Sequence, residues 1–447
     1  MGRVMVLVLA ALLAVNYAVS QQGPDFAGID KRTYELYLDS SWKELLSAGE
    51  EAINQGIDYY YLRMRLGIAA FETEDYSKAI RHFRKALEFN SADDVAKEYL
   101  YFAFMFYGRE MEAHKVAQSF SRELRRKYSY AVRSAVRSFS LSTTAGFIHD
   151  TEITDRYSAD NLPDIDGSQA ITRNYVHFGA GLEHEAGNRL RITHAAGYFS
   201  KNYLYFSREP GEDRLISDAK VNQFQYYLSG RLLLGNGIFL VPAVHYLNVQ
   251  IPSEALVVGR GRFSFVQQQV VTRHDVASSL GVEKYAGKIR SGFSAGYSYI
   301  NEQEQLRGTF SFAWFPFGNL NLYSASEITR YTVMPADSHD GTFIFSHTIG
   351  FRTFPGLWLE LWGQLGKIEN YAGPGAYLVF NDTGSTRGQF GISILAPFVS
   401  ERFETALHYN YSIRESRFVP DDPAADITTC KNNTNYNNIT AVIRWKF

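Results

Sequence analysis

Cysteine, net charge and long apolar runs are all scarce in this chain of 447 residues. The single cysteine, Cys430, excludes an intrachain disulfide framework and a cysteine-based zinc finger. A formal net charge of -2 excludes a strongly basic nucleic-acid-binding protein, so we expect no nucleic-acid partner. No stretch reaches the roughly 18 apolar residues that a spanning helix needs, which excludes a bundle of membrane helices.

Aromatic residues and glycine are abundant instead. The chain has 30 Tyr, 32 Phe, 5 Trp and 35 Gly, at a mean hydropathy of -0.23. This mixture is typical of strands whose apolar and polar side chains alternate, and such strands point to a sheet with two different faces.

Residues 1–20 predict a secretory signal peptide. Arg3 precedes an apolar run from Val4 to Val15, and the small residues at 18–20 form a cleavage pattern before Gln21. The alternative is an N-terminal membrane anchor, but the apolar run is too short to span a bilayer.

Residues 21–120 predict a helical repeat. Residues such as Leu45, Ala79 and Ala113 are 34 positions apart and match in size or polarity. The clearest copy combines small and aromatic residues: Leu66, Gly67, Tyr76, Ala79, Phe83 and Ala86. This pattern resembles the tetratricopeptide repeat, and the resemblance implies about three repeats. It also implies that Gly67 and Ala79 lie where paired helices approach and that Phe83 fills the gap.

The resemblance implies a surface that binds a protein partner in the periplasm. A spacer that binds nothing is the alternative. We expect His82 and His114, which fall on these helices, to be solvated.

Residues 121–138 predict a basic linker helix. Its basic residues, against one acid at Glu123, are Arg122, Arg125, Arg126, Lys127, Arg133 and Arg137. Such a run is typical of a solvated helix face, and contact with lipid headgroups or with a partner is the alternative.

Residues 139–447 alternate between apolar and polar positions. Ile439, Ala441 and Ile443 alternate with polar residues or valine, and Leu359 and Leu361 alternate with Trp and Glu. Such strands need apolar surroundings on one face and water or polar filling on the other. A transmembrane β-barrel supplies both, and its closure leaves no unpaired edge in lipid. A soluble sandwich or propeller is the alternative.

Short connections predict the number of strands. They lie at residues 186–188, 235–237, 286–288, 317–319, 354–356 and 398–401, where Gly and Asn favour tight hairpins. Longer polar segments lie at 151–171, 207–219, 252–262, 372–385 and 419–436. With a first strand at 139–150 and a last at 437–447, the count is about fourteen strands, both chain ends lying on the short-turn side. The predicted fold class is α + β: an N-terminal α-solenoid followed by an antiparallel transmembrane barrel.

The closing residues Trp445 and Phe447 resemble the C-terminal aromatic signal of bacterial outer-membrane proteins, which the barrel-assembly machinery reads. With the signal peptide, the resemblance implies a barrel surrounded by outer-membrane lipid of a Gram-negative bacterium and repeats in the periplasm.

The barrel interior is predicted to be polar. Alternation places these charged residues on the inward face: Arg191, Arg231, Arg290, Arg352, Glu360, Glu404, Arg414, Arg444 and Lys446. They are either paired structural charges or determinants of selectivity. About fourteen strands enclose too wide a lumen for small side chains to fill, so we expect either a narrow channel or a plug formed by inward loops or the helical domain.

No catalytic, cofactor or metal site is predicted. Ser294 lies in a Gly-x-Ser-x-Gly string, but that motif needs a sharp strand-to-helix turn, and here the string falls inside an alternating strand. The His-Asp pairs at 149–150, 274–275 and 339–340 are neighbours in sequence, so in a strand they point to opposite faces.

The order of signal peptide, repeats and barrel resembles surface lipoprotein assembly modifiers and exopolysaccharide export porins. The resemblance implies a non-enzymatic outer-membrane protein whose repeats capture a protein or polymer client, which the barrel anchors, exports or helps to display. One alternative is a passive porin with a structural periplasmic domain, and another is an outer-membrane enzyme.

Overall fold

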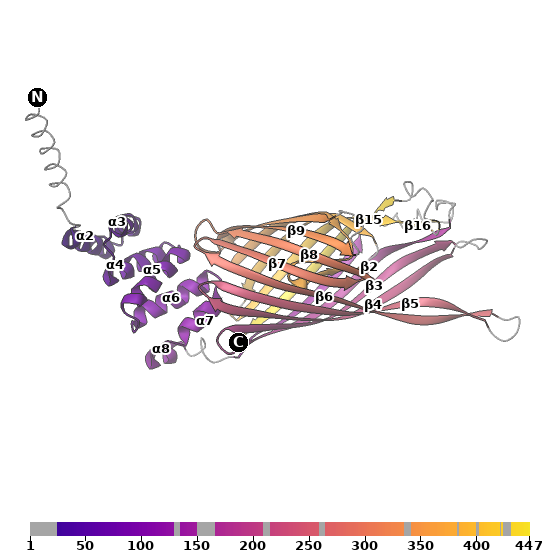
Figure 1. The fold of residues 1–447 in the computed structure, drawn as a ribbon, viewed down its shortest axis with the longest axis horizontal. Helices are drawn as coiled ribbons and strands as arrows, with labels where there is room; N and C mark the ends of the chain where they lie inside the picture. Colours follow the sequence, from indigo (N-terminus) through magenta and orange to yellow (C-terminus); the bar gives the residue numbers. More distant parts are fainter. Residues whose placement is uncertain are drawn as a thin grey trace, which may run out of the picture. The chain divides into compact units, whose positions relative to one another are not determined.

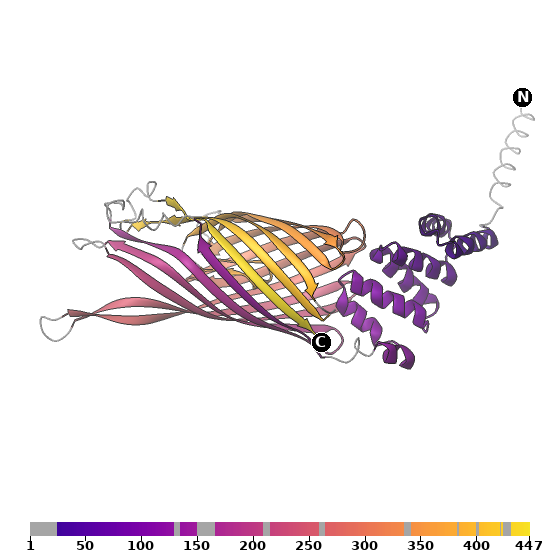
Figure 2. The same cartoon turned by 180° about the vertical axis from the view of Figure 1, so that it is seen from behind.

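The computed structural model describes residues 25–128, 135–149, 166–208, 215–258, 264–334, 341–381, 384–398, 402–420, 422 and 431–447. Within these ranges the chain forms a helical unit and a β unit (Figures 1 and 2). The predicted signal peptide, Cys430, Arg133 and the pair at 339–340 lie outside them.

The helical unit consists of consecutive antiparallel hairpins. Its helices are α2 (Phe26–Leu38), α3 (Trp42–Asn54), α4 (Tyr60–Glu72), α5 (Tyr76–Phe89), α6 (Asp94–Phe106), α7 (Glu110–Ala117) and α8 (Arg122–Lys127). The first helices of the hairpins begin at Phe26, Tyr60 and Asp94, so their starts are 34 residues apart. The second helices, α3, α5 and α7, have the same spacing.

Small residues let these helices approach closely. Leu66, Ala79, Phe83 and Ala86 are fully buried. A Cβ atom at Gly67 would lie 2.6 Å from Cε1 of Phe83, so only glycine fits beneath this ring. Tyr76, at the start of α5, is half-buried and packs edge-on against Phe71, with 5.4 Å between ring centroids.

The basic linker helix is shorter than predicted. Helix α8 ends at Lys127, and strand β1 (Val136–Ile148) already begins at Val136. Arg125 donates hydrogen bonds to the carbonyl oxygens of Phe120 (3.0 Å) and Gln118 (2.9 Å). This arginine therefore binds carbonyl groups near the end of α7, a use of basic residues that composition does not reveal.

The expectation that His82 is solvated is wrong. Its side chain is only 1% exposed, and its Nδ1 lies 3.1 Å from Nη1 of Arg63, which is itself held by Asp58. Burial, reinforced by the nearby positive charges of Arg81 and Arg63, lowers the pKa of His82 to about 3. His82 is therefore neutral in the folded helical unit at pH 7.

We predict that acid destabilises the helical unit through His82. Below the unfolded-state pKa, about 6.5, the unfolded chain binds a proton that the folded unit does not, so stability falls as pH decreases. The slope approaches about 1.4 kcal/mol per pH unit at the acid end of the window between pH 6.5 and 4.5. Thermal melts followed by ellipticity at 222 nm should show this slope in the native chain and lose it in His82→Gln.

The matched control is His114→Gln, because His114 is a partly exposed histidine in the same unit. It should keep the native slope. Above pH 4.5 the titration of Asp58, whose pKa is lowered by hydrogen bonds from Arg63, contributes little. An identical slope in the native chain and in His82→Gln would contradict the assignment.

The β unit is a closed antiparallel barrel of 14 strands. After β1 they are β2 (Gly167–Ala186), β3 (Leu190–Arg208), β4 (Leu215–Gly235), β5 (Ile238–Val258), β6 (Ser264–Ala286), β7 (Ile289–Ile300), β8 (Gln303–Trp314), β9 (Leu322–Met334), β10 (Thr342–Phe354), β11 (Leu357–Ile368), β14 (Ser385–Phe398), β15 (Phe403–Arg417) and β18 (Tyr436–Lys446). Strand β1 closes the barrel because it pairs with β18 on one side and with β2 on the other. The predicted fold class is confirmed.

The six predicted short connections all separate neighbouring barrel strands. At the turn between β4 and β5, Asn236 (φ 47°) and Gly237 (φ 74°) have the positive φ of a tight hairpin.

Both ends of the barrel chain lie on this short-turn side, since Ser138 pairs with Lys446. The β7–β8 connection at Asn301 and Glu302 is also tight, an exception to the expected alternation.

Within the predicted loops at 207–219 and 252–262, the residues that the structure describes are strand. Strand β4 already begins at Leu215, and β5 continues to Val258, paired with β6 as far as Ser264. The pairing continues because backbone groups supply the hydrogen bonds, whatever the polarity of the side chains. Short strands β16 (Val419–Pro420) and β17 (Lys431–Asn433) extend the sheet beside β2 and β15.

The outer face of the barrel is apolar and exposed. Phe139 pairs with Trp445, and Phe293 pairs with Phe310, all of them outward and exposed. The exposed apolar side chains around the outer face also include Leu141, Phe178, Phe224, Leu280, Phe343, Leu365, Leu407 and Ile443. In the helical part of the chain that the structure describes, no helix is long and apolar enough to cross a membrane.

Candidate functional site

The connection between β11 and β14 folds into the barrel. It contains β12 (Tyr371–Ala372), the 3-10 helix η2 (Pro374–Ala376) and β13 (Val379–Phe380). We call residues 369–381 the inward segment. Tyr371, Ala372 and Ala376 are at most 1% exposed, although Ala372 and Ala376 fall in the predicted polar loop at 372–385.

Apolar residues of the barrel wall receive this segment. Ala372 and Ala376 pack with Ala277 of β6 and Ile300 of β7 in one buried cluster. Val379 packs against a second patch, formed by Val221, Leu247 and Val249 of β4 and β5. Tyr371 packs with Tyr331, Ile344 and Ile368, and its ring centroid lies 5.2 Å from that of Tyr331. The inward segment thus reaches from β11 to β4, on the far side of the lumen.

Buried polar side chains bind the backbone of the segment. Arg307 of β8 donates to the carbonyl oxygens of Ala372 (2.5 Å) and Ser278 (3.1 Å). Nδ1 of His245 lies 2.9 Å from the carbonyl oxygen of Ala376, so it donates in the tautomer protonated there. The hydroxyl of Tyr227 donates to the carbonyl oxygen of Gly375 (3.2 Å).

Asp275 of β6 holds the end of the segment. Its carboxylate is fully buried and accepts from Nδ2 of Asn381 (3.1 Å), from the backbone N–H of Asn301 (3.1 Å) and from Arg273 (3.1 Å). Its neighbour His274 instead contacts Tyr246, with 2.7 Å between Nδ1 and the hydroxyl. The two residues therefore face opposite sides of the sheet, as predicted for adjacent strand positions.

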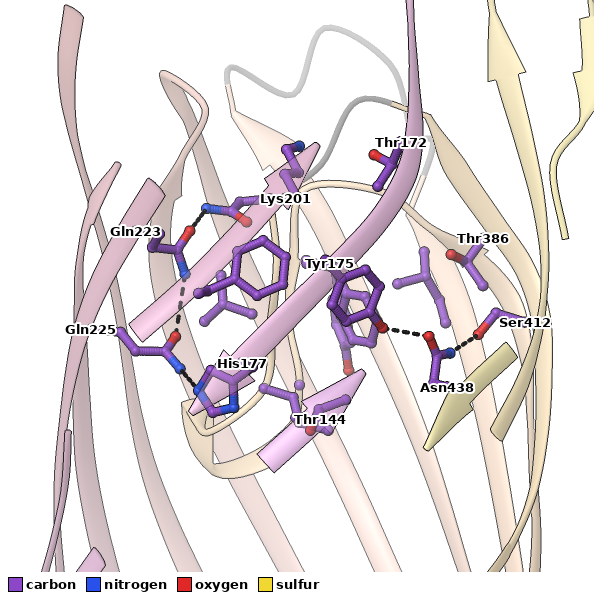
Figure 3. A pocket seen from close by; sticks show the side chains of 18 of the residues that line it. Thr144, Thr172, Tyr175, His177, Lys201, Gln223, Gln225, Thr386, Ser412 and Asn438 are labelled. Atoms are coloured by element: carbon purple, nitrogen blue, oxygen red, sulfur yellow. Dashed lines mark hydrogen bonds between the residues drawn. The ribbon is translucent and has the colours of Figure 1, made fainter. Parts of the chain in front are cut away.

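A cavity of about 1570 Å³ remains between the inward segment and the barrel wall. Figure 3 shows part of its lining, where side chains of β1 to β4 face those of β14, β15 and β18. The lining is dominated by aromatic rings, amides and hydroxyls. The charged residues that line it are few: Lys201, Arg273, Glu327, Glu369 and Arg414.

One chain of neutral hydrogen bonds runs along β2 and β4. Nε2 of His177 lies 2.7 Å from Nε2 of Gln225, and Gln223 donates to Gln225 (3.2 Å). Asn381 of the inward segment donates to Gln223 (2.8 Å), which joins the segment to this wall.

A second chain of neutral hydrogen bonds starts on β2 and continues over β18 and β15 to β14 and β11. It begins where the Tyr175 hydroxyl donates to Asn438 (2.5 Å), and Asn438 donates to Ser412 (3.3 Å) (Figure 3). Asn410 donates to Gln389 (3.0 Å). Gln389 in turn donates to Gln364 (2.5 Å). The two chains give the cavity fixed donors and acceptors without net charge.

Most of the predicted lumen charges lie elsewhere. Except for Arg414, none of them lines the cavity. Their strand positions place the others towards the short-turn end, where Arg231 pairs with Glu283 (2.8 Å) and Arg191 pairs with Glu185 (3.2 Å).

The remaining charges also have neighbours. Lys446 binds Glu404, Arg444 lies 3.8 Å from Glu404, and Glu360 accepts from Tyr323. Three arginines lie beside aromatic residues: Arg352 over Trp358, Arg414 over Tyr436, and Arg290 opposite Tyr285 in the strand register.

The C-terminal aromatic residues stack on one another. The rings of Trp445 and Phe447 lie 6.0 Å apart, and Trp445 also contacts Phe403 at 4.7 Å. Ser294 lies within β7, paired with Gly281 and Thr309, so the strand-to-helix turn of the hydrolase motif is not formed there. Among the described residues, no group of three His, Cys, Asp or Glu side chains could hold a metal ion.

No protein-family model and no curated protein matches this chain. Among solved structures, the toluene transporter TodX of Pseudomonas putida is 9% identical, with a TM-score of 0.43 over 71% of this chain and 91% of that one. A FadL homologue of Pseudomonas aeruginosa is also 9% identical, with a TM-score of 0.45 over 70% and 90%. The translocator domain of the autotransporter NalP of Neisseria meningitidis is 10% identical, with a TM-score of 0.31 over 77% and 99%. The barrel described above rests on its own strand pairing.

Proposed function

We propose that this protein is an outer-membrane channel for small solutes, narrowed by its inward segment. The observation that carries the proposal is the cavity of about 1570 Å³ inside the closed barrel, bounded on one side by that segment. The apolar outer face continues around a closed sheet and supports a lipid environment, because exposing so large an apolar surface to water is unfavourable.

The geometry supports passage of small solutes better than export of a client. The inward segment packs against β4 to β8 across the lumen, so a folded protein or a thick polymer has no clear path. Capture of a protein partner by the helical unit remains a separate proposal. It is supported by exposed aromatic side chains on the first helices of two successive hairpins, Tyr34 on α2 and Tyr61 on α4.

Single-channel recording in planar lipid bilayers tests the proposed function. The purified protein should insert and give discrete steps of small, steady conductance in potassium chloride. The chain without residues 25–128 should give steps of the same kind if the barrel alone forms the path. If the inserted, heat-modifiable barrel gives no steps at any voltage, the channel proposal fails.

A further inference from the structure

We infer that the cavity binds a neutral, hydroxyl-rich ring compound of about mono- to disaccharide size. The inference rests on the proposed function, because the bound compound would be the class of solute that the channel selects. The binding site itself is argued from one row of side chains on the inner wall.

Two aromatic rings in this row lie flat on glycine. Tyr175 is directly opposite Gly146 in the β1–β2 register, and Trp362 is directly opposite Gly391 in the β11–β14 register. A Cβ atom added to either glycine would overlap the facing ring. Each ring therefore covers bare backbone with one face, an arrangement known to stabilise glycine in sheets. Both rings also line the cavity, where the Phe199 ring lies 5.2 Å from that of Tyr175 and adds a further apolar surface beside it.

Two asparagines occupy the same row between the rings. Gly146 pairs with Asn438, Asn438 pairs with Asn410, and Asn410 pairs with Gly391. The row around the wall therefore reads Tyr175, Gly146, Asn438, Asn410, Gly391 and Trp362. Two apolar platforms with amides between them match a sugar, whose C–H face packs on an aromatic ring while its hydroxyls need both donors and acceptors.

The polar groups around this row are neutral and already ordered. Gln389 and Gln364 continue the amide chain from Asn410, and His177 of β2 and Gln225 of β4 also line the cavity. Prepositioned amides reduce the ordering cost of binding. A fully charged ligand would instead need a desolvated partner of opposite charge. Arg273 is held by Asp275, and Glu369 lies 2.9 Å from Lys367, so these two charges are already paired.

Isothermal titration calorimetry on the full chain tests the inference. The protein is kept in a detergent without a sugar headgroup and titrated with maltose, and separately with glucuronate and glucosamine. We expect maltose to bind and Tyr175→Leu and Trp362→Leu each to weaken it about tenfold, the loss of one stacking contact. Gly146→Ala should have a similar effect, because it displaces the Tyr175 ring without removing it.

The matched control is Tyr323→Leu. Tyr323 also lies on a facing glycine, Gly350, but it does not line the cavity, so this variant should bind maltose like the native chain. Maltose binding that is absent, or equal in all variants, would overturn the inference, as would tighter binding of either charged sugar. Because calorimetry needs no conduction, a protein that binds maltose but gives no conductance steps would fail the channel proposal alone.

Discussion

Replacing residues 371–380 with three glycines is expected to increase the single-channel conductance several-fold. The replaced residues carry the apolar side chains that cross the lumen, including Ala372, Ala376 and Val379. Without them, a barrel of 14 strands has too few large inward side chains to fill its interior. Current should therefore pass through the whole lumen rather than around the segment. Recording in planar bilayers at one fixed salt concentration measures the change.

The same variant should also give a noisier open level, because the wall patch of Val221, Leu247 and Val249 loses its cover. The matched control is Asn236→Gly, a change in the short turn between β4 and β5, which should conduct like the native chain. An unchanged conductance after removal of the segment would show that the segment does not obstruct the path.

Arg307→Met is expected to release the inward segment. The guanidinium donates to the carbonyl oxygens of Ala372 and Ser278, and methionine fills a similar volume without donors. Loss of ~2 kcal/mol from these charge-assisted hydrogen bonds would make local opening about 30-fold more frequent. In a Cys430→Ser background, a cysteine introduced by Ala372→Cys reports this opening through its rate of reaction with a maleimide.

Arg330→Met is the control for this experiment, because Arg330 is exposed on the outer face, where its guanidinium lies over Phe343. It should leave the slow labelling of the buried position unchanged. Equal labelling rates in Arg307→Met and in the unaltered background would mean that Arg307 does not hold the segment.

The barrel could be predicted from the sequence because its physics is local. Alternation at residues such as Ile439, Ala441 and Ile443 sets two faces of a strand, and glycine or asparagine at 235–237 sets a hairpin. Both patterns involve residues that are close together in the sequence. Closure follows because an antiparallel sheet with an exposed apolar face cannot leave an edge in lipid.

The site was missed because its contacts join residues far apart in sequence. Arg307 and Ala372 are 65 residues apart, and Asn381 and Gln223 are 158 residues apart, and each pair is in contact in the closed barrel. A signal was nevertheless present: residues 372–380 of the predicted polar loop are largely apolar, and Leu247 and Val249 place apolar side chains on the inward face. An apolar loop together with apolar side chains on the inward face predicts that the loop packs against the inner wall of the barrel.

His82 shows the same limit on a smaller scale. Its position on a helix suggested that it is exposed to solvent, but in the folded unit it contacts Arg63 of the preceding helix, α4. The inward charges were predicted from strand parity, and Arg231, one of them, pairs with Glu283 at 2.8 Å. Parity predicts which face of the strand a side chain is on, but not how far along the strand it lies. Most of the predicted charges lie near the short-turn end of the barrel and not at the cavity.

Chemical cross-linking inside the native barrel tests the position of the inward segment most directly. Cysteines are introduced by Ala277→Cys and Ala372→Cys in the Cys430→Ser background, since Ala277 and Ala372 belong to one buried cluster. A short bifunctional thiol reagent should join them within one chain, closing a loop that makes the denatured protein migrate faster. If no intrachain product forms while both cysteines react freely with the reagent, the segment does not lie inside the barrel.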